Sequence, residues 1–123
     1  MNQAIELTVR NAEILNSNQR LHTQEKNKRT RNLRGFAQVM ARYKKLEPMG
    51  KTHCVVHLGF PNEIRRDPAN YYPTVKAMID GFVDAGIFVD DNHKLFIGPD
   101  FRVSETKSSR GAITFTFEFA EVN

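Results

Sequence analysis

The chain has 123 residues, 40% of them hydrophobic and nine of them Phe, which is enough for one domain with its own core over residues 1–123. A net charge of +4 and a pI near 9.4 suggest a polyanionic partner. The one cysteine, Cys54, excludes a disulfide framework, and no apolar run approaches the ~20 residues of a membrane span. We therefore expect a soluble, cytoplasmic protein without a membrane partner.

The first predicted element is a strand over residues 4–10, where apolar and polar side chains alternate. The Asn-, Ser- and charge-rich stretch 11–32 predicts a long loop that runs into an amphipathic helix over about 30–46. The apolar positions that define this helix are Leu33, Phe36, Ala37, Met40 and Tyr43. A β-rich run over 51–60 then predicts a central strand.

A second helix is predicted over about 71–85, with Gly86 at its C-cap. Short strands are predicted for "IFV", "KLFIG" and "FRVSE", the last two on either side of a Gly-Pro break. Residues 112–122 alternate strictly, so that Ile113, Phe115, Phe117 and Phe119 share one face. This order of elements predicts an α+β fold, a mixed β-sheet with two main helices packed on one face.

Basic residues are concentrated in one segment, which runs from Arg20 to Lys45 and contains a single acid, Glu25. Its nine basic residues are Arg20, Lys26, Lys28, Arg29, Arg31, Arg34, Arg42, Lys44 and Lys45. The rest of the chain is therefore net negative. A basic arm on an acidic body is typical of a surface that binds phosphates.

Acidic residues flank the second predicted helix, with Asp67 before it and Asp90-Asp91 in the turn after the "IFV" segment. Carboxylate oxygens are the ligands that Mg²⁺ prefers, and Mg²⁺ can activate water and neutralise phosphate charge. The same residues also fit a helix N-cap, Asp67 with Pro68 behind it, and an ordinary polar turn. Spacing alone leaves both interpretations open.

Three charged residues, Lys76, Asp80 and Asp84, recur every four positions and therefore share one helix face. A lysine in the first turn opposes the helix dipole, which is consistent with a role in binding phosphate. The alternative is a surface ion pair between Lys76 and Asp80. Similarly, the adjacent Arg65 and Arg66 could hold a phosphate or belong to a solvated loop.

The histidines and the cysteine give weaker indications of a functional site. His53 and His57 are four apart on a predicted strand, about 13 Å, which argues against a shared metal. His93, after the Asp90-Asp91 turn, is a candidate outer ligand or proton shuttle. Cys54 lies in an apolar run and is expected in the core.

The stretch "RRDPANYYPTVKAMIDGFVDAGIFVDD" resembles the RusA family of Holliday-junction resolvases, especially those of phages and prophages. The shared pattern is a basic loop, an Asp, a spaced Asn, a lysine-bearing helix with an Asp one turn later, Ala-Gly and Asp-Asp. The resemblance implies a homodimeric Mg²⁺-dependent endonuclease, with Mn²⁺ as a substitute and no organic cofactor. Such an enzyme resolves four-way DNA junctions by paired symmetric nicks in recombination and repair.

The resemblance also implies roles for individual residues. Asp67, Lys76 and Asp91 would be catalytic, and the metal ligands would be Asp67, Asp91, Asp90 and Asp80, with Asn70 in support. The DNA-binding residues would be Arg20, Lys26, Lys28, Arg29, Arg31, Arg34, Arg65 and Arg66.

One position departs from the family pattern, because Ala69 stands where a second loop acid is usual. Asn70, Asp80 or water could replace that ligand, since Mg²⁺ usually keeps several waters. The alternative is a relative that binds branched DNA but has lost cleavage. A small interaction protein with merely solvated charges is a third hypothesis.

Overall fold

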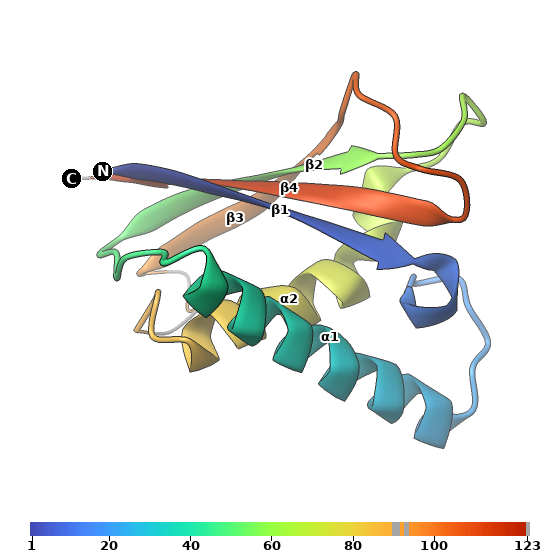
Figure 1. Ribbon diagram of the computed structural model, residues 1–123, viewed down its shortest axis with the longest axis horizontal. Coiled ribbons are helices and arrows are strands. Elements are labelled where there is room, and N and C mark those ends of the chain that lie inside the picture. The colour runs from blue at the N-terminus through green and yellow to red at the C-terminus, as the bar shows by residue number, and fades with distance from the viewer. Residues whose placement is uncertain (90–91, 93, 123) are drawn as a thin grey trace.

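The computed structural model describes residues 1–89, 92 and 94–122 (Figure 1). Within these ranges the chain forms four strands, two α-helices and two 3-10 helices. In chain order they are β1 (Asn2–Arg10), η1 (Asn11–Glu13), α1 (Thr23–Tyr43), β2 (Thr52–Gly59), η2 (Pro68–Tyr71), α2 (Tyr72–Asp84), β3 (Phe96–Val103) and β4 (Ala112–Glu121).

The four strands form one mixed sheet in the order β1-β4-β2-β3. Strand β4 pairs antiparallel with β1 and with β2, whereas β2 and β3 are parallel. Both α-helices lie on the same face of this sheet, and α1 lies below its β1 side (Figure 1). The predicted α+β architecture, a mixed sheet with two helices on one face, is therefore confirmed.

The core forms between the helices and the inner face of β4. Phe115, Phe117 and Phe119 of that strand are buried, as the alternation predicted. Phe82 of α2 meets Phe117 and Phe119 edge-on, with ring centroids 5.1 and 5.5 Å apart. Truncating a buried Phe of this kind costs about 3–5 kcal/mol, so this contact holds α2 firmly against the sheet.

The two helices approach each other closely at Gly81. A Cβ at this position would overlap the carbonyl oxygen of Arg34 and lie 2.9 Å from Cβ of Ala37. Glycine therefore allows the backbones of α1 and α2 to pack together. One turn away, the Arg34 guanidinium binds the Asp84 carboxylate through two hydrogen bonds of 2.5 and 2.8 Å.

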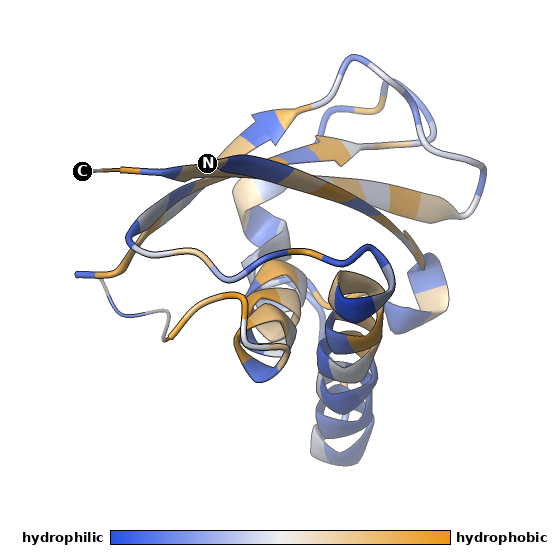
Figure 2. Ribbon diagram, turned by 60° about the vertical axis from the view of Figure 1, so that its left-hand side comes forward, coloured by the Kyte–Doolittle hydropathy of each residue, from blue (hydrophilic) through white to orange (hydrophobic). Residues whose placement is uncertain are grey.

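The long loop predicted for residues 11–32 is wrong, because α1 already begins at Thr23. Its first turns carry no apolar stripe since they extend past the sheet, and Figure 2 shows them coloured hydrophilic. Local interactions stabilise them instead. His22 caps the helix by accepting a hydrogen bond from the Gln24 N–H, and Glu25 pairs with Arg29 at 2.8 Å.

The strand predicted for residues 87–89 is also wrong. Ile87 and Phe88 are buried, but Ile87 forms its backbone hydrogen bonds with the carbonyl of Phe82 and the N–H of Met49, neither of them in a strand. Ile87 and Phe88 are therefore apolar residues that are buried without being paired in the sheet. The C-cap predicted at Gly86 lies one residue earlier, at Ala85, and Gly86 follows it with a left-handed φ of 82° and an N–H that donates to the carbonyl of Val83.

The two short strands predicted around Gly98-Pro99 form one continuous strand, β3. Gly98 has a φ of 105°, and a Cβ there would lie 2.5 Å from the carbonyl oxygen of Cys54. Glycine therefore lets β3 pass close to β2 and continue. None of the helices in the described ranges is long and apolar enough to cross a membrane.

Candidate functional site

Asp67 opens the stretch that resembles the resolvases, and it caps the short helix η2. Its Oδ1 accepts a hydrogen bond from the N–H of Ala69 at 3.0 Å, and its carbonyl accepts one from Asn70 at 3.1 Å. The residue is exposed. The predicted cap is therefore confirmed. The carboxylate is held in place through one oxygen while the residue stays open to solvent.

The loop after η1 is fastened to this region by two sets of hydrogen bonds. The carbonyl of Asn70 accepts from the N–H of Ser17 at 2.7 Å and from its hydroxyl at 3.2 Å. The buried hydroxyl of Thr74 accepts from the N–H of Leu15 at 2.8 Å and donates to its carbonyl at 2.6 Å. These contacts place the segment before α1 directly against η2 and the start of α2.

Two residues of the basic arm extend this region. Arg20 and Lys26 line a hollow of about 150 Å³ whose wall also includes Pro73, the second residue of α2. Pro73 has no N–H, and the N–H of Tyr72 is bonded to the carbonyl of Ala69, so the positive charge of the hollow comes from Arg20 and Lys26. The hollow therefore offers two cationic side chains to an anion, beside a Ser17 that is bound to Asn70 of η2.

Lys76 and Asp80 lie on the solvent-facing side of α2 and form an ion pair of 2.8 Å. Lys76 is in the second turn, because the helix begins at Tyr72. The next residue on this face, Asp84, is bound to Arg34 of α1, and this bond lowers the pKa of its carboxyl group. The surface ion pair expected as the alternative for Lys76 and Asp80 is thus present.

The two loop arginines have different surroundings. Arg66 lies over the ring of Phe60 at 4.9 Å and donates to the side-chain oxygen of Asn62 and the carbonyl of Ile64. Arg65 is exposed and lines a groove of about 430 Å³ together with Lys107. Arg65 is therefore the more available of the two for an external phosphate.

The basic residues of α1 also divide into two groups. Arg29 donates to Glu25 and to the carbonyl of Ile14, at 2.8 Å in both cases, and Arg34 is committed to Asp84. These two stabilise the fold. Lys26, Lys28 and Arg31 are exposed, and they constitute the accessible part of the predicted DNA-binding set on this helix.

Asp90, Asp91 and His93 lie outside the residues that the structure describes. Their predicted approach to Asp67 therefore stays a prediction. Among the described residues, no group of three or more His, Cys, Asp or Glu side chains is arranged to hold a metal ion. Asp67 is exposed, and the η2 helix that it caps is hydrogen-bonded through Asn70 to Ser17 in the wall of the hollow.

His53 and His57, which are too far apart on β2 to share a metal, have carboxylate partners on the face of the sheet opposite the helices. His53 pairs with Asp100 at 2.6 Å, and His57 pairs with Glu118. These pairs join neighbouring strands, so they depend on strand register, which the sequence does not contain. Neither pair belongs to the region around Asp67.

Comparison with known proteins gives no family assignment. No protein-family model matches the chain, and no curated protein matches it at a significant level.

Proposed function

We propose that this protein is a Mg²⁺-dependent endonuclease that binds four-way DNA junctions as a homodimer and resolves them by paired nicks, inside a bacterial or phage-infected cell. The observation that carries the proposal is the position of the basic arm. Arg20 and Lys26 line one hollow together with Ser17, and Ser17 is hydrogen-bonded to Asn70 in η2, the short helix that Asp67 caps. A phosphate bound by Arg20 and Lys26 would thus contact a segment that Ser17 and Asn70 join to the helix capped by Asp67, the residue that the resemblance assigns to catalysis.

The charge on α1 supports a nucleic-acid partner. Lys26, Lys28 and Arg31 are exposed on the same helix that begins at the hollow. A duplex carries one negative charge per about 1.7 Å of helix axis, so a row of cations can follow its backbone and release counterions. Binding of this kind weakens steeply with salt, which separates it from a surface that is merely solvated.

The chemistry of Asp67 fits a hard divalent cation. One oxygen is fixed by the Ala69 N–H, which orients the carboxylate, and the residue is exposed. When bound, Mg²⁺ would activate water and neutralise charge on the phosphate. Lys76, held on the face of α2 by Asp80, would bind the phosphate, as the resemblance implies, and Asp90 and Asp91 would complete the ligand set.

The test uses Asp67→Asn, because an asparagine oxygen can still accept the Ala69 N–H and preserve the cap. Wild-type protein should nick a labelled synthetic four-way junction in the presence of Mg²⁺ or Mn²⁺ and should stop when the metal is chelated. Asp67→Asn should bind the junction with unchanged affinity but nick it at least 100-fold more slowly. Equal nicking by wild type and Asp67→Asn would refute the assignment.

A second candidate function is supported by Ala69. This residue contributes a backbone N–H to the Asp67 cap, but its side chain cannot ligate a metal, and the described residues contain no group of three metal-ligating side chains. The alternative is therefore a protein that binds branched DNA without cutting it. Junction binding without nicking by wild type, together with nicking by Ala69→Asp, would establish this alternative.

A further inference from the structure

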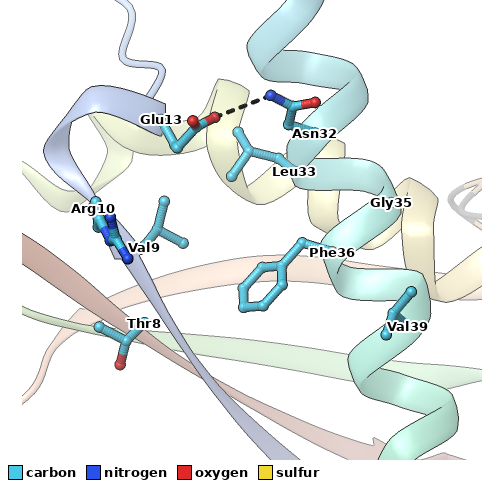
Figure 3. Close-up of a pocket in the computed structure, with 9 residues that line it drawn as sticks. All are labelled: Thr8, Val9, Arg10, Glu13, Asn32, Leu33, Gly35, Phe36 and Val39. Atoms are coloured by element: carbon cyan, nitrogen blue, oxygen red, sulfur yellow. Dashed lines mark hydrogen bonds between the residues drawn. The ribbon is translucent and has the colours of Figure 1, made fainter.

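An apolar groove of about 670 Å³ runs between β1, at one edge of the sheet, and α1. Phe36 extends from α1 toward Val9 of β1, and Val39 lines the groove one turn further along the helix (Figure 3). Tyr43 follows at the next helical interval, so the three side chains form one row on α1. Phe36, Val39 and Tyr43 are 37%, 63% and 74% exposed. Exposed apolar side chains that gather beside a groove are typical of a binding surface.

Gly35 also lines this groove, in the middle of α1 (Figure 3). Glycine inside a helix is destabilising relative to alanine, so its presence calls for a reason. At Gly81 the reason is the close approach of α1 and α2. Gly35 has no such role in the described part of the chain, because a Cβ there would find no neighbouring atom within 4 Å. The open space at Gly35 instead suits a backbone that approaches α1 from outside the molecule.

Positive charge borders the apolar row on the side of α1 that faces away from the core. Lys28, Gly35 and Arg42 are spaced seven residues apart and therefore lie in one line along the helix, next to the row of Phe36 and Val39. Both Lys28 and Arg42 are exposed. An element that packs on the apolar row would meet these two charges along its flank and would come closest to α1 at Gly35.

The other wall of the groove adds a further cation. Arg10, the last residue of β1, lines the groove and is exposed. The acid in the same wall, Glu13, accepts a hydrogen bond from the side-chain amide of Asn32 at 3.3 Å. The groove therefore combines an apolar floor with positive charge on both sides. Such a surface selects an apolar partner that also carries carboxylates.

The spacing of the row and its charge together define the occupant. Phe36, Val39 and Tyr43 follow the three- and four-residue intervals of a helix–helix seam, which fits a helix better than an extended segment. A second copy of α1 does not suit this seam. Two-fold packing would bring the basic lines of both copies together, and like charges in flanking positions oppose association. Acidic flanking residues in the occupant would instead pair with Lys28 and Arg42.

We propose that this groove is a docking site for an acidic amphipathic helix of another protein. The helix lies alongside α1 on the helix side of the sheet, with its apolar stripe against Phe36 and Val39. A row of its Glu or Asp residues pairs with Lys28 and Arg42, and its backbone passes close to Gly35. The inference requires neither DNA nor the nuclease activity. Because Asp67 is not part of the groove, this docking and the proposed function stand or fall separately.

The first test measures binding of a designed, fluorescently labelled peptide to the full chain by fluorescence anisotropy. The peptide has about 18 residues of Leu, Ala and Glu, with its leucines in one helical stripe and its glutamates on both flanks. One control peptide has the same composition in a scrambled order without a stripe, and a second has Lys in place of Glu. The acidic amphipathic peptide should bind at least tenfold more tightly than either control. Equal binding of the scrambled peptide, or no binding of the amphipathic one, would overturn the proposal.

The second test uses variants of the groove. Gly35→Gln, Phe36→Glu and Arg42→Glu should each weaken binding of the acidic peptide at least tenfold. Gly35→Gln is the decisive variant, because glutamine favours a helix and should not lower the melting temperature, so its effect reports the lost space alone. The matched controls are Val103→Glu and Arg102→Glu on β3, at the opposite edge of the sheet, which should bind as wild type does. Wild-type affinity in Gly35→Gln would overturn the proposal.

The third measurement distinguishes the proposed helix from a second copy of the chain. The molar mass of wild type, Gly35→Gln and Phe36→Glu is measured by sedimentation over a range of concentrations. The three masses should agree, whatever the oligomeric state, because the groove is not the contact between copies. A mass that falls in both variants would show that a second copy fills the groove and would overturn the proposal.

Discussion

Arg34 of α1 and Asp84 at the last residue of α2 form a two-point ion pair that ties the basic helix to the helix of the candidate site. The bond lowers the pKa of Asp84 and raises that of Arg34. A residue that sequence analysis assigned to DNA binding therefore has a structural role, and Asp84, on the same face as Lys76 and Asp80, is engaged in the fold.

The first prediction concerns this pair. Asp84→Asn should lower the free energy of unfolding at neutral pH by about 0.5–1 kcal/mol, a value kept small because solvent screens both side chains. The pKa of Asp84 is lowered in the folded chain, so its contribution is present at neutral pH. This stabilisation is lost as the pH falls from about 4, the pKa of Asp in an unfolded chain, through the lower pKa that Asp84 has in the folded chain.

Chemical denaturation of wild type and Asp84→Asn at a series of pH values checks this prediction. The difference between the two should shrink below pH 4. Glu105→Gln, which removes an exposed acid that has no ion-pair partner among the described residues, is the control and should change stability little. A stability difference between wild type and Asp84→Asn that grows as the pH falls would contradict the predicted direction.

The second prediction concerns the helix contact at Gly81. Gly81→Ala should destabilise the protein by about 1–3 kcal/mol, because its Cβ would press on the backbone of Arg34. Gly35→Ala has no atom within 4 Å of the new Cβ and should instead stabilise α1 by about 0.5–1 kcal/mol. Thermal unfolding of both variants at one protein concentration tests the pair. If both substitutions changed the stability by a similar amount, the close approach of α1 and α2 at Gly81 would be contradicted.

The third prediction concerns Cys54. Burial, assisted by the nearby Asp100 carboxylate, raises the pKa of its thiol to about 12. Very little thiolate is present at pH 8, so a maleimide should label the folded chain far more slowly than the denatured chain. Thr106→Cys, at an exposed loop position, should be labelled within minutes. Rapid labelling of Cys54 in the native wild type would contradict its burial.

The fourth prediction concerns the exposed basic residues of α1. The triple change of Lys26, Lys28 and Arg31 to Gln should weaken junction binding. It should also reduce the slope of log affinity against log salt by about 0.9 for each DNA phosphate that the variant no longer neutralises. The same number of charges removed from Lys51, Arg102 and Arg110 is the control. If both triple variants weakened binding equally, the effect would reflect net charge and not the α1 surface.

Much of the fold follows from local pattern. The alternation of β4 and the apolar spacing of α2 predict both elements to within about one residue, because one face of each is buried. The cap at Asp67 was also predictable, since Asp before Pro at a helix start satisfies backbone N–H groups locally.

The remaining features depend on tertiary structure. The first turns of α1 extend past the sheet, so hydrophobic periodicity could not reveal them. Ile87 and Phe88 are apolar because they are buried beneath the sheet, which a short run cannot distinguish from a strand. The His53–Asp100 pair and the fastening of Ser17 to Asn70 join distant segments, and no sequence spacing encodes them.

The central claim is that the η2–α2 region around Asp67 cuts DNA junctions with the help of Mg²⁺. The most direct measurement maps the nicks in a four-way junction that is labelled on each of its four strands in turn. Wild type with Mg²⁺ should nick two opposing strands at symmetric positions, and Asp67→Asn should leave all four strands intact while binding the junction normally. Absence of nicks with wild type, or the same nicks with Asp67→Asn, would contradict the account.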